Sequence, residues 1–315
     1  MRTNKFLAIN TIQMFNRYFV GLVFSFLLLS GLSCAQSDVK VIDYMDQTKS
    51  YSQQGAALYN KYLFQFTALG ICDVYDMKKK RHIAQMNYES SKQKHCDTAC
   101  FGWYKVDKKD DFPVIYVSGS QIWQNKEHGL IWVYRIVHKK KKWGLSLVQI
   151  IKTPQIENTG ICPDALLESS DSTMWIMGWK TDISHPRKDG SGADLTFMKF
   201  KVPSLNEGHL DGHGIRTTEI ILADTLESFD IHNAHIVQQG LCLRNKKVYV
   251  PYGGSTDGYQ GIDVISLKER RVIKSIDLMG TKVFEPEAVF FYKDEMFVAD
   301  QATTIKKIVD QKGNE

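Results

Sequence analysis

What this 315-residue sequence has little of already excludes several classes of protein. Proline is scarce, with 7 residues, and no stretch beyond the N-terminal region shows a convincing helical period. With 43% apolar and 24% charged residues, the composition is that of a packed globular protein rather than a disordered, collagen-like or coiled-coil chain. There is one long apolar run, at residues 18–32, so a protein with several membrane spans is excluded as well.

Net charge is also low once the N-terminal segment is set aside. The chain carries a formal charge of +5, but residues 1–33 hold Arg2, Lys5 and Arg17 and no acid, so the remainder carries only +2. That charge is too small to predict binding to nucleic acid or to an anionic membrane.

The apolar run at residues 18–32 has the features of an export signal. It has the length of a signal-peptide core, it is short for a membrane span, and Arg17 supplies the positive flank. We therefore expect a signal peptide over residues 1–35, and a single domain over residues 36–315 that acts outside the cytoplasm. Met14 is the expected start of translation.

Two ways of ending this signal compete. Leu32-Ser33-Cys34 resembles a bacterial lipoprotein box, in which Cys34 is lipidated and anchors the protein at the outer membrane or cell surface. Ser33-Cys34-Ala35 also offers the small residues of an ordinary cleavage site, which would give a soluble periplasmic or secreted protein. We favour the lipoprotein, in which the membrane is contacted only through the lipid.

Cysteine usage neither requires nor excludes disulfides. Beyond Cys34 there are five cysteines, an odd number, so at most two disulfides form and one thiol is left over. No CxxC pair occurs, which argues against a structural zinc site. For Cys72 and Cys242 we expect isolated buried thiols.

An internal repeat predicts the fold. Residues 54–65 (QGAALYNKYLFQ) and 239–250 (QGLCLRNKKVYV) share Gln, Gly, Leu, Asn and Lys in register, and residues 73–83 match 263–273 without a gap. Each copy reads as short strands separated by polar turns, which is typical of antiparallel hairpins. A four-stranded unit that recurs every 40–50 residues or so predicts an all-β fold, the β-propeller.

Placing the strands gives five blades. Blade one covers residues 54–87 and blade four covers 239–278, and the strands expected for the others are 101–106, 112–117, 130–137 and 143–151 (blade two), 164–167, 174–179, 195–202 and 219–224 (blade three), and 287–292, 296–299 and 304–309 (blade five). Blade five lacks one strand, which residues 39–44 can supply to close the ring. A sixth blade stays open, because residues 227–238 could hold further strands.

The repeat also resembles known families. The pattern QG…N-K-x-V-Y…DV-x-x-L-K is similar to the YVTN-type propeller of exported bacterial proteins, a resemblance that implies fold and not activity. Gln238-Gln239-Gly240-Leu241 with Val248-Tyr249 resembles the propeller-type glutaminyl cyclases, which are five-bladed and often exported. That resemblance implies acidic groups at the channel. Five-bladed glycosidases are the other enzymes with this architecture.

The first strand of each propeller blade lines the central channel, so the residues at which these strands begin should converge on one mouth. The candidates for a ligand site there are Gln54, His95, Asp97, Asp164, His235, Gln239, Glu285 and Glu287. Facing carboxylates repel one another and raise at least one pKa, which suits general acid catalysis, while the same oxygens could hold Ca²⁺. Alternatively, the glutamines cap strand edges and the acids pair with Lys or Arg.

Three further features could bind a partner. His209, Asp211 and His213 alternate in a glycine-flanked loop and could ligate a metal such as Zn²⁺, or the loop could simply be solvated. Trp123 lies in a polar loop and could stack on a sugar. The cationic runs at residues 78–81 and 139–142 fall in turns on the rim, where they are solvated or contact an acidic glycan or a membrane surface.

These observations predict a monomeric envelope protein that binds a glycan or another small molecule at the channel mouth. The alternatives are an enzyme at the same place, glycosidase-like or glutaminyl-cyclase-like, and a scaffold that binds an envelope protein. The sequence does not decide between catalysis and binding, nor does it identify a metal.

Overall fold

The computed structural model describes residues 39–48, 53–88, 96–119, 129–140, 142–154, 164–179, 193–235, 238–254, 259–301 and 304–310. In these ranges the chain is all-β, with strands β1 to β22 and a single three-residue 3-10 helix, η1 (Leu222–Asp224). None of the described helical structure has the length and apolarity needed to cross a membrane. The predicted signal peptide and Cys34 lie outside the described residues, so they stay predictions.

Five sheets, each with four antiparallel strands at its centre, form the blades of a five-bladed β-propeller. This confirms the predicted fold class. Blade one is β2–β5, blade two β6–β9, blade three β10, β11, β12 and β15, blade four β16–β19, and blade five β20, β21, β22 and β1. The bounds are β2 (Gln53–Tyr59), β3 (Tyr62–Thr67), β4 (Ile71–Asp76), β5 (Arg81–Asn87), β6 (Thr98–Phe101), β7 (Ile115–Gly119), β8 (Leu130–Lys139), β9 (Lys142–Lys152), β10 (Asp164–Glu168), β11 (Thr173–Trp179), β12 (Ala193–Lys201), β15 (Glu227–Ala234), β16 (Cys242–Arg244), β17 (Lys247–Tyr252), β18 (Gly261–Ser266), β19 (Arg271–Asp277), β20 (Pro286–Tyr292), β21 (Glu295–Asp300), β22 (Thr304–Asp310) and β1 (Val39–Asp46).

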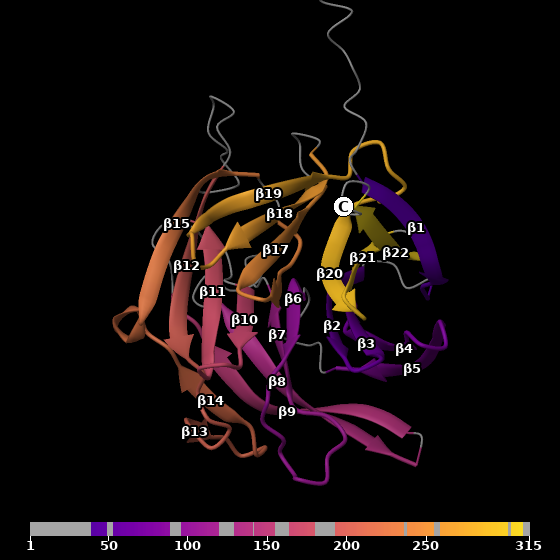
Figure 1. Cartoon of the computed structure of the whole chain (residues 1–315). Coiled ribbons are helices and arrows are strands. Elements are labelled where there is room, and N and C mark those ends of the chain that lie inside the picture. Colours follow the sequence, from indigo (N-terminus) through magenta and orange to yellow (C-terminus); the bar gives the residue numbers. More distant parts are fainter. Residues whose placement is uncertain are drawn as a thin grey trace, which may run out of the picture. The chain divides into compact units, whose positions relative to one another are not determined.

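The N-terminal strand closes the ring, as the sequence predicted. β1 pairs antiparallel with β22, from Val39 opposite Asp310 to Asp46 opposite Thr304, and so becomes the outer strand of blade five (Figure 1). The first and last described segments of the chain are thereby joined in one sheet.

The inner strands form the ring, because each contacts the inner strands of both neighbouring blades: β2 contacts β6, β6 contacts β10, β10 contacts β16, β16 contacts β20, and β20 contacts β2. The apolar core is divided in the same way. Each of the five buried clusters draws its side chains from two neighbouring blades. Burial between blades is therefore what holds the propeller together, since most core side chains pack against the sheet next door.

Tight turns set the register of the hairpins. Asn245 and Lys246 both have positive φ, as do Lys293 and Asp294, and each pair joins an inner strand to the second strand of its blade. Two consecutive residues with positive φ make the type I′ turn, whose twist matches that of the flanking strands. These polar dipeptides are the turn signals that the repeat showed.

Two strands of blade two are placed differently from the prediction. The inner strand is β6, at 98–101 rather than 101–106, and the second is β7, at 115–119 rather than 112–117. Residues 102–114 instead form a long connection, whose register is fixed by hydrogen bonds from Gly102 N to Val114 O and from Val114 N to Tyr104 O.

The fourth strand of blade three was predicted at residues 219–224 and is instead β15. Its buried Phe229 and Ile231 alternate with polar residues, as expected for a half-buried strand. Residues 227–234 are therefore used inside blade three, and the five-bladed count holds. The preceding segment contains β13 (His209–Leu210) and β14 (Arg216–Glu219), and β14 adds in parallel to the outer strand β9 of blade two. An outer strand offers unpaired backbone groups, which explains why it can accept this addition.

Candidate functional site

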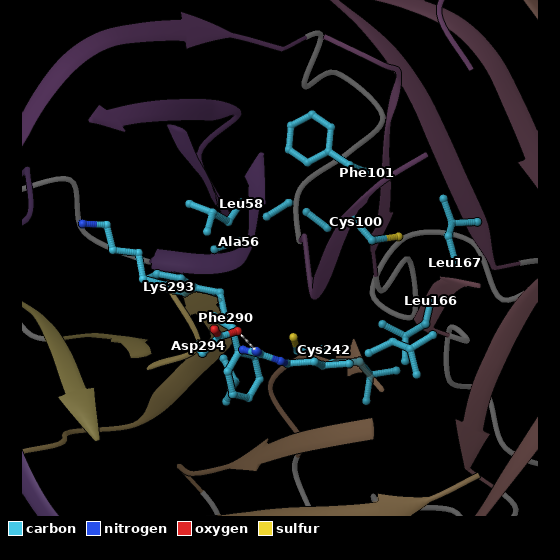
Figure 2. A pocket seen from close by; sticks show the side chains of 17 residues that line it. Ala56, Leu58, Cys100, Phe101, Leu166, Leu167, Cys242, Phe290, Lys293 and Asp294 are labelled. Atoms are coloured by element: carbon cyan, nitrogen blue, oxygen red, sulfur yellow. Dashed lines mark hydrogen bonds and ion pairs between the residues drawn. The ribbon is translucent and has the colours of Figure 1, made fainter. Parts of the chain in front are cut away.

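A cavity of about 460 Å³ lies in the middle of the ring. All five inner strands contribute to its wall, through the residues in their C-terminal halves (Figure 2). From β2 come Ala56, Ala57 and Leu58, from β6 Ala99, Cys100 and Phe101, from β10 Leu166 and Leu167, from the β16 segment Leu241, Cys242, Leu243 and Arg244, and from β20 Val289, Phe290 and Phe291. Its volume is within the range of small-molecule sites in proteins.

Most residues that line the wall are apolar, but backbone and charged groups supply about half of its exposed surface. Figure 2 shows Leu58, Phe101 and Leu166 around the open centre, each on a different blade. The thiols of Cys100 and Cys242 add to the wall, and neither cysteine forms a disulfide with a described residue. Cys242 is partly buried as a residue, and burial of its sulfur raises the pKa of the thiol to about 12. This thiol is therefore neutral at physiological pH.

Charged groups meet the apolar wall at one end of the cavity, where the turn between β20 and β21 meets β16. Arg244 forms an ion pair with Asp294, and its guanidinium lies 4.3 Å from the ring centroid of Phe291. Figure 2 shows Asp294 among the residues that line the cavity. The Asp294 side chain is 92% exposed. An ion pair in such an exposed place contributes little stability, so an anionic ligand can displace Asp294 at small cost.

The opposite ends of the inner strands meet much more closely. Gly55 N donates a hydrogen bond to Cys96 O at 2.9 Å, which joins blades one and two. Gly240 lies against the backbone carbonyls of Asp97 and Glu287, from blades two and five. The channel is thus narrowed by backbone at the end where the inner strands begin, and the cavity occupies the other end.

Glu287 is the most unusual group at the narrow end. It is fully buried, Oε1 accepts a hydrogen bond from the Gln301 side chain, and Oε2 has no hydrogen-bond partner among the described residues. Burial raises its pKa well above the ordinary value for glutamate, and the nearby carboxylates of Glu285 and Asp97 raise it further. The raised pKa that the sequence led us to expect in this group of acids therefore belongs to Glu287.

The structure gathers part of the predicted set at this narrow end. Gln239 Nε2 donates to Glu285 Oε1 at 2.9 Å and to Gly253 O at 3.1 Å, while Gln54 is buried on β2. Asp97 is close enough to Glu287 to affect its pKa. His235 stacks on the ring of Tyr259 at a centroid distance of 3.5 Å.

The other predicted site residues lie outside the part of the chain that the structure describes, or lie in the loop predicted to bind metal. Asp164 begins β10, but its side chain, like all of His95 and Trp123, falls outside the described residues. In the loop predicted to bind metal, Asp211 Oδ1 accepts the backbone N–H groups of Ile215 at 2.8 Å and His213 at 2.9 Å. These two hydrogen bonds lower the pKa of Asp211, and the bond from Ile215 has the larger effect.

A metal centre has no support from the described part of the chain. Within it, no three His, Cys, Asp or Glu side chains are grouped as metal ligands. The hydrogen bonds to Asp211 give the loop residues His209, Asp211 and His213 a structural explanation, because a carboxylate that accepts backbone N–H groups two and four residues onward holds a turn. Ca²⁺ and Zn²⁺ binding stay predictions.

Sequence reasoning missed the residues of the cavity wall. It considered the beginnings of the inner strands, whereas the cavity is at their ends. The same repeat contained the necessary signal: parallel inner strands converge at both ends, and Leu243-Arg244 directly precedes the Asn245-Lys246 turn. A cation that follows apolar residues at such a strand end could have been singled out.

The buried carboxylate makes a testable prediction about pH. Because the folded-state pKa of Glu287 is raised, the folded protein binds more protons than the unfolded chain above pH 4.5 or so, and its stability falls as pH rises through that window. Glu287→Gln removes the titrating carboxyl group, and with it this pH dependence of stability, but keeps a side-chain oxygen that can accept the hydrogen bond from Gln301. We expect the variant to be more stable than the wild type at pH 8, by on the order of 1 kcal/mol or more, with a gap that closes toward pH 4.

Urea denaturation of both proteins across this pH range measures the effect. Glu219→Gln changes an exposed carboxylate and is the matched control. We expect its free energy of unfolding to depend on pH as that of the wild type does. A Glu287→Gln protein with the wild-type pH dependence would contradict the assignment of a raised pKa to Glu287.

Comparisons with known proteins find similar solved structures but do not assign the chain to a family. No family model matches the chain, and no curated protein matches it. Among solved structures, the glutaminyl cyclase of Myxococcus xanthus aligns at 9% identity with a TM-score of 0.48, over 86% of this chain and 95% of its own. A putative oxidoreductase (glucose dehydrogenase) of Thermus thermophilus aligns at 9% identity with a TM-score of 0.45, over 86% of this chain and 100% of its own. At these values the likenesses carry no argument about activity.

Proposed function

We propose that this propeller is a binding protein for a small ligand with an apolar body and one anionic group. The observation that supports it is the cavity of about 460 Å³, which all five inner strands line. Its wall would receive the apolar body, and Arg244 at its edge would bind the anion in place of Asp294. A glycan, which the sequence suggested as ligand, would need more hydrogen-bonding side chains than this wall offers.

The place of action in this proposal follows the sequence prediction. We propose that the protein is exported and anchored through a lipid on Cys34, so that the cavity samples ligands outside the cytoplasm. The apolar segment at residues 18–32 and Leu32-Ser33-Cys34 support this.

An enzyme at the narrow end is the second candidate. The fully buried Glu287, with its raised pKa and an oxygen that has no partner among the described residues, has properties found in general acids. The narrow end, however, is filled by Gln239, Glu285 and Gln301 around it. The cavity is the more accessible place for a ligand, so binding is our first choice.

Alkyl carboxylates test the proposal. We expect decanoate and decanol to bind the wild-type protein and displace the fluorescent probe anilinonaphthalene sulfonate. Arg244→Gln should weaken decanoate by about ten-fold and leave decanol unchanged, because a charge-assisted hydrogen bond contributes about 1.5–3 kcal/mol. Leu58→Trp, which fills the cavity, should weaken both ligands.

Arg271→Gln is the matched control, because this arginine pairs with Glu269 at the surface and does not line the cavity. It should bind both ligands as the wild type does. Equal losses of decanoate and decanol in Arg244→Gln, or no binding by the wild type, would contradict the proposed site.

A further inference from the structure

Exposed cations are concentrated at one end of the ring. This end, where the inner strands finish, is formed by the turns after the first and third strands of each blade, and we call it the cationic face. It carries residues 78–81 where β4 is joined to β5, Lys139, Lys140 and Lys142 at the adjoining ends of β8 and β9, and Lys246 and Lys247 where β16 is joined to β17. All of these side chains are exposed.

The opposite end has a different composition. Its described turns between second and third strands, at residues 68–70, 253–254 and 259–260, contain no lysine or arginine. The described residues at this end include one half-exposed lysine, Lys152, and one exposed lysine, Lys282. Within the part of the chain that the structure describes, the exposed lysines and arginines are therefore more numerous at the cationic face than at the opposite end.

Exposed acids, Asp107, Asp111, Asp211 and Glu269, also lie in the turns of this face, but part of its cations have no ion-pair partner among the described residues. In the described chain, none of Lys78, Lys79, Lys139, Lys140 and Lys142 forms a salt bridge with another described residue. Lys139 and Lys142 are directly opposite each other in the β8–β9 ladder. Like charges directly opposite are unfavourable for a sheet, so the fold itself gives no reason for this pair.

The N-terminal strand begins at the same face. Val39 is opposite Asp310 at the end of β22, and β22 runs in the direction of the inner strands because blade five is antiparallel throughout. Only four residues separate Cys34 from Val39 in the sequence. Five Cα–Cα steps span about 18 Å at most, so a lipid on Cys34 would tether this face close to a bilayer.

We propose that the cationic face binds the surface of a bilayer that contains anionic phospholipids. A single acyl anchor gives only marginal membrane binding, and a polybasic patch is a common second signal. The face supplies that patch next to the predicted anchor, with its lysines on turns that can lie against lipid headgroups. This inference does not depend on the ligand proposed for the cavity.

Vesicle sedimentation tests the inference without the lipid anchor. The protein is residues 36–315, which contain every strand of the ring. We expect it to bind vesicles of phosphatidylcholine with phosphatidylglycerol, to bind phosphatidylcholine alone far more weakly, and to dissociate at high salt. Lys78→Glu with Lys139→Glu should weaken binding to the anionic vesicles by about ten-fold or more.

Lys152→Glu with Lys282→Glu makes the same change in net charge at the other end of the ring, and should bind as the wild type does. If the first double variant does not fold, Lys78→Gln with Lys139→Gln should still weaken binding. Equal losses in both double variants, equal binding to uncharged vesicles, or binding to dextran sulfate without binding to vesicles would each overturn the inference. Decanoate binding should be unchanged in the Lys78 and Lys139 variants, which separates this result from the cavity proposal.

Discussion

Gly240→Ala should lower the free energy of unfolding by about 3 kcal/mol or more, or prevent the ring from forming. A Cβ at this position would lie 2.7 Å from Asp97 O and 2.8 Å from Glu287 O. Both atoms are backbone and belong to different blades, so neither can move without shifting an inner strand. The glycine is therefore required by close approach of three blades rather than by its φ angle.

Gly144→Ala is the matched control, because a Cβ there meets nothing within 4 Å. It should change stability by less than about 0.5 kcal/mol, as is usual for surface substitutions. Urea denaturation of both variants measures the difference. A Gly240→Ala protein as stable as Gly144→Ala would show that the blades do not meet as closely as the structure has them.

Lys306→Met should cost about 3–5 kcal/mol, the effect of leaving one member of a buried ion pair without its partner. Lys306 Nζ lies 2.6 Å from Asp300 Oδ2, and the two side chains are 2% and 0% exposed. The same oxygen accepts the backbone N–H of Phe284 at 2.9 Å. Methionine preserves the length of the side chain but leaves the carboxylate buried without its cation.

Lys307→Met tests the neighbouring residue on the other face of β22. Lys307 pairs with Glu295 at 2.5 Å, but this pair is partly exposed, so we expect a loss below about 1 kcal/mol. Adding Asp300→Asn to Lys306→Met should recover part of the loss, since the buried charge is removed. Thermal or urea unfolding that gives equal losses for the two lysine variants would contradict a buried role for Lys306.

The architecture could be predicted because its signals are local. Turn dipeptides such as Asn245-Lys246 and Lys293-Asp294 fix hairpins, and the repeated hairpins define blades. The addition of β14 to blade two could not be predicted in this way. It depends on a free strand edge offered by β9, more than 60 residues earlier in the chain, and no local pattern records that pairing.

The site was predictable only in part, for a related reason. The direction of the inner strands follows from the repeat, so the convergence of Gln239, Glu285 and Glu287 could be expected. How tightly they converge depends on the packing of backbone at Gly55 and Gly240, and a sequence does not give that distance. The cavity lies at the other ends of the inner strands, at residues such as Arg244, which the repeat placed at a strand end without indicating a cavity there.

The pairing of β1 with β22 has a consequence for the order of events during folding. Its two partners are the first and last described strands, so this sheet cannot be completed until residues 304–310 have been synthesised, more than 250 residues after β1. Contacts between such distant segments carry a large loop-closure entropy and form late. Until then β1 and β21 both present open strand edges, which favour pairing with a second copy of the chain. Pairing of β22 with β1 and β21 removes these open edges, which limits the time during which they can pair with a second copy.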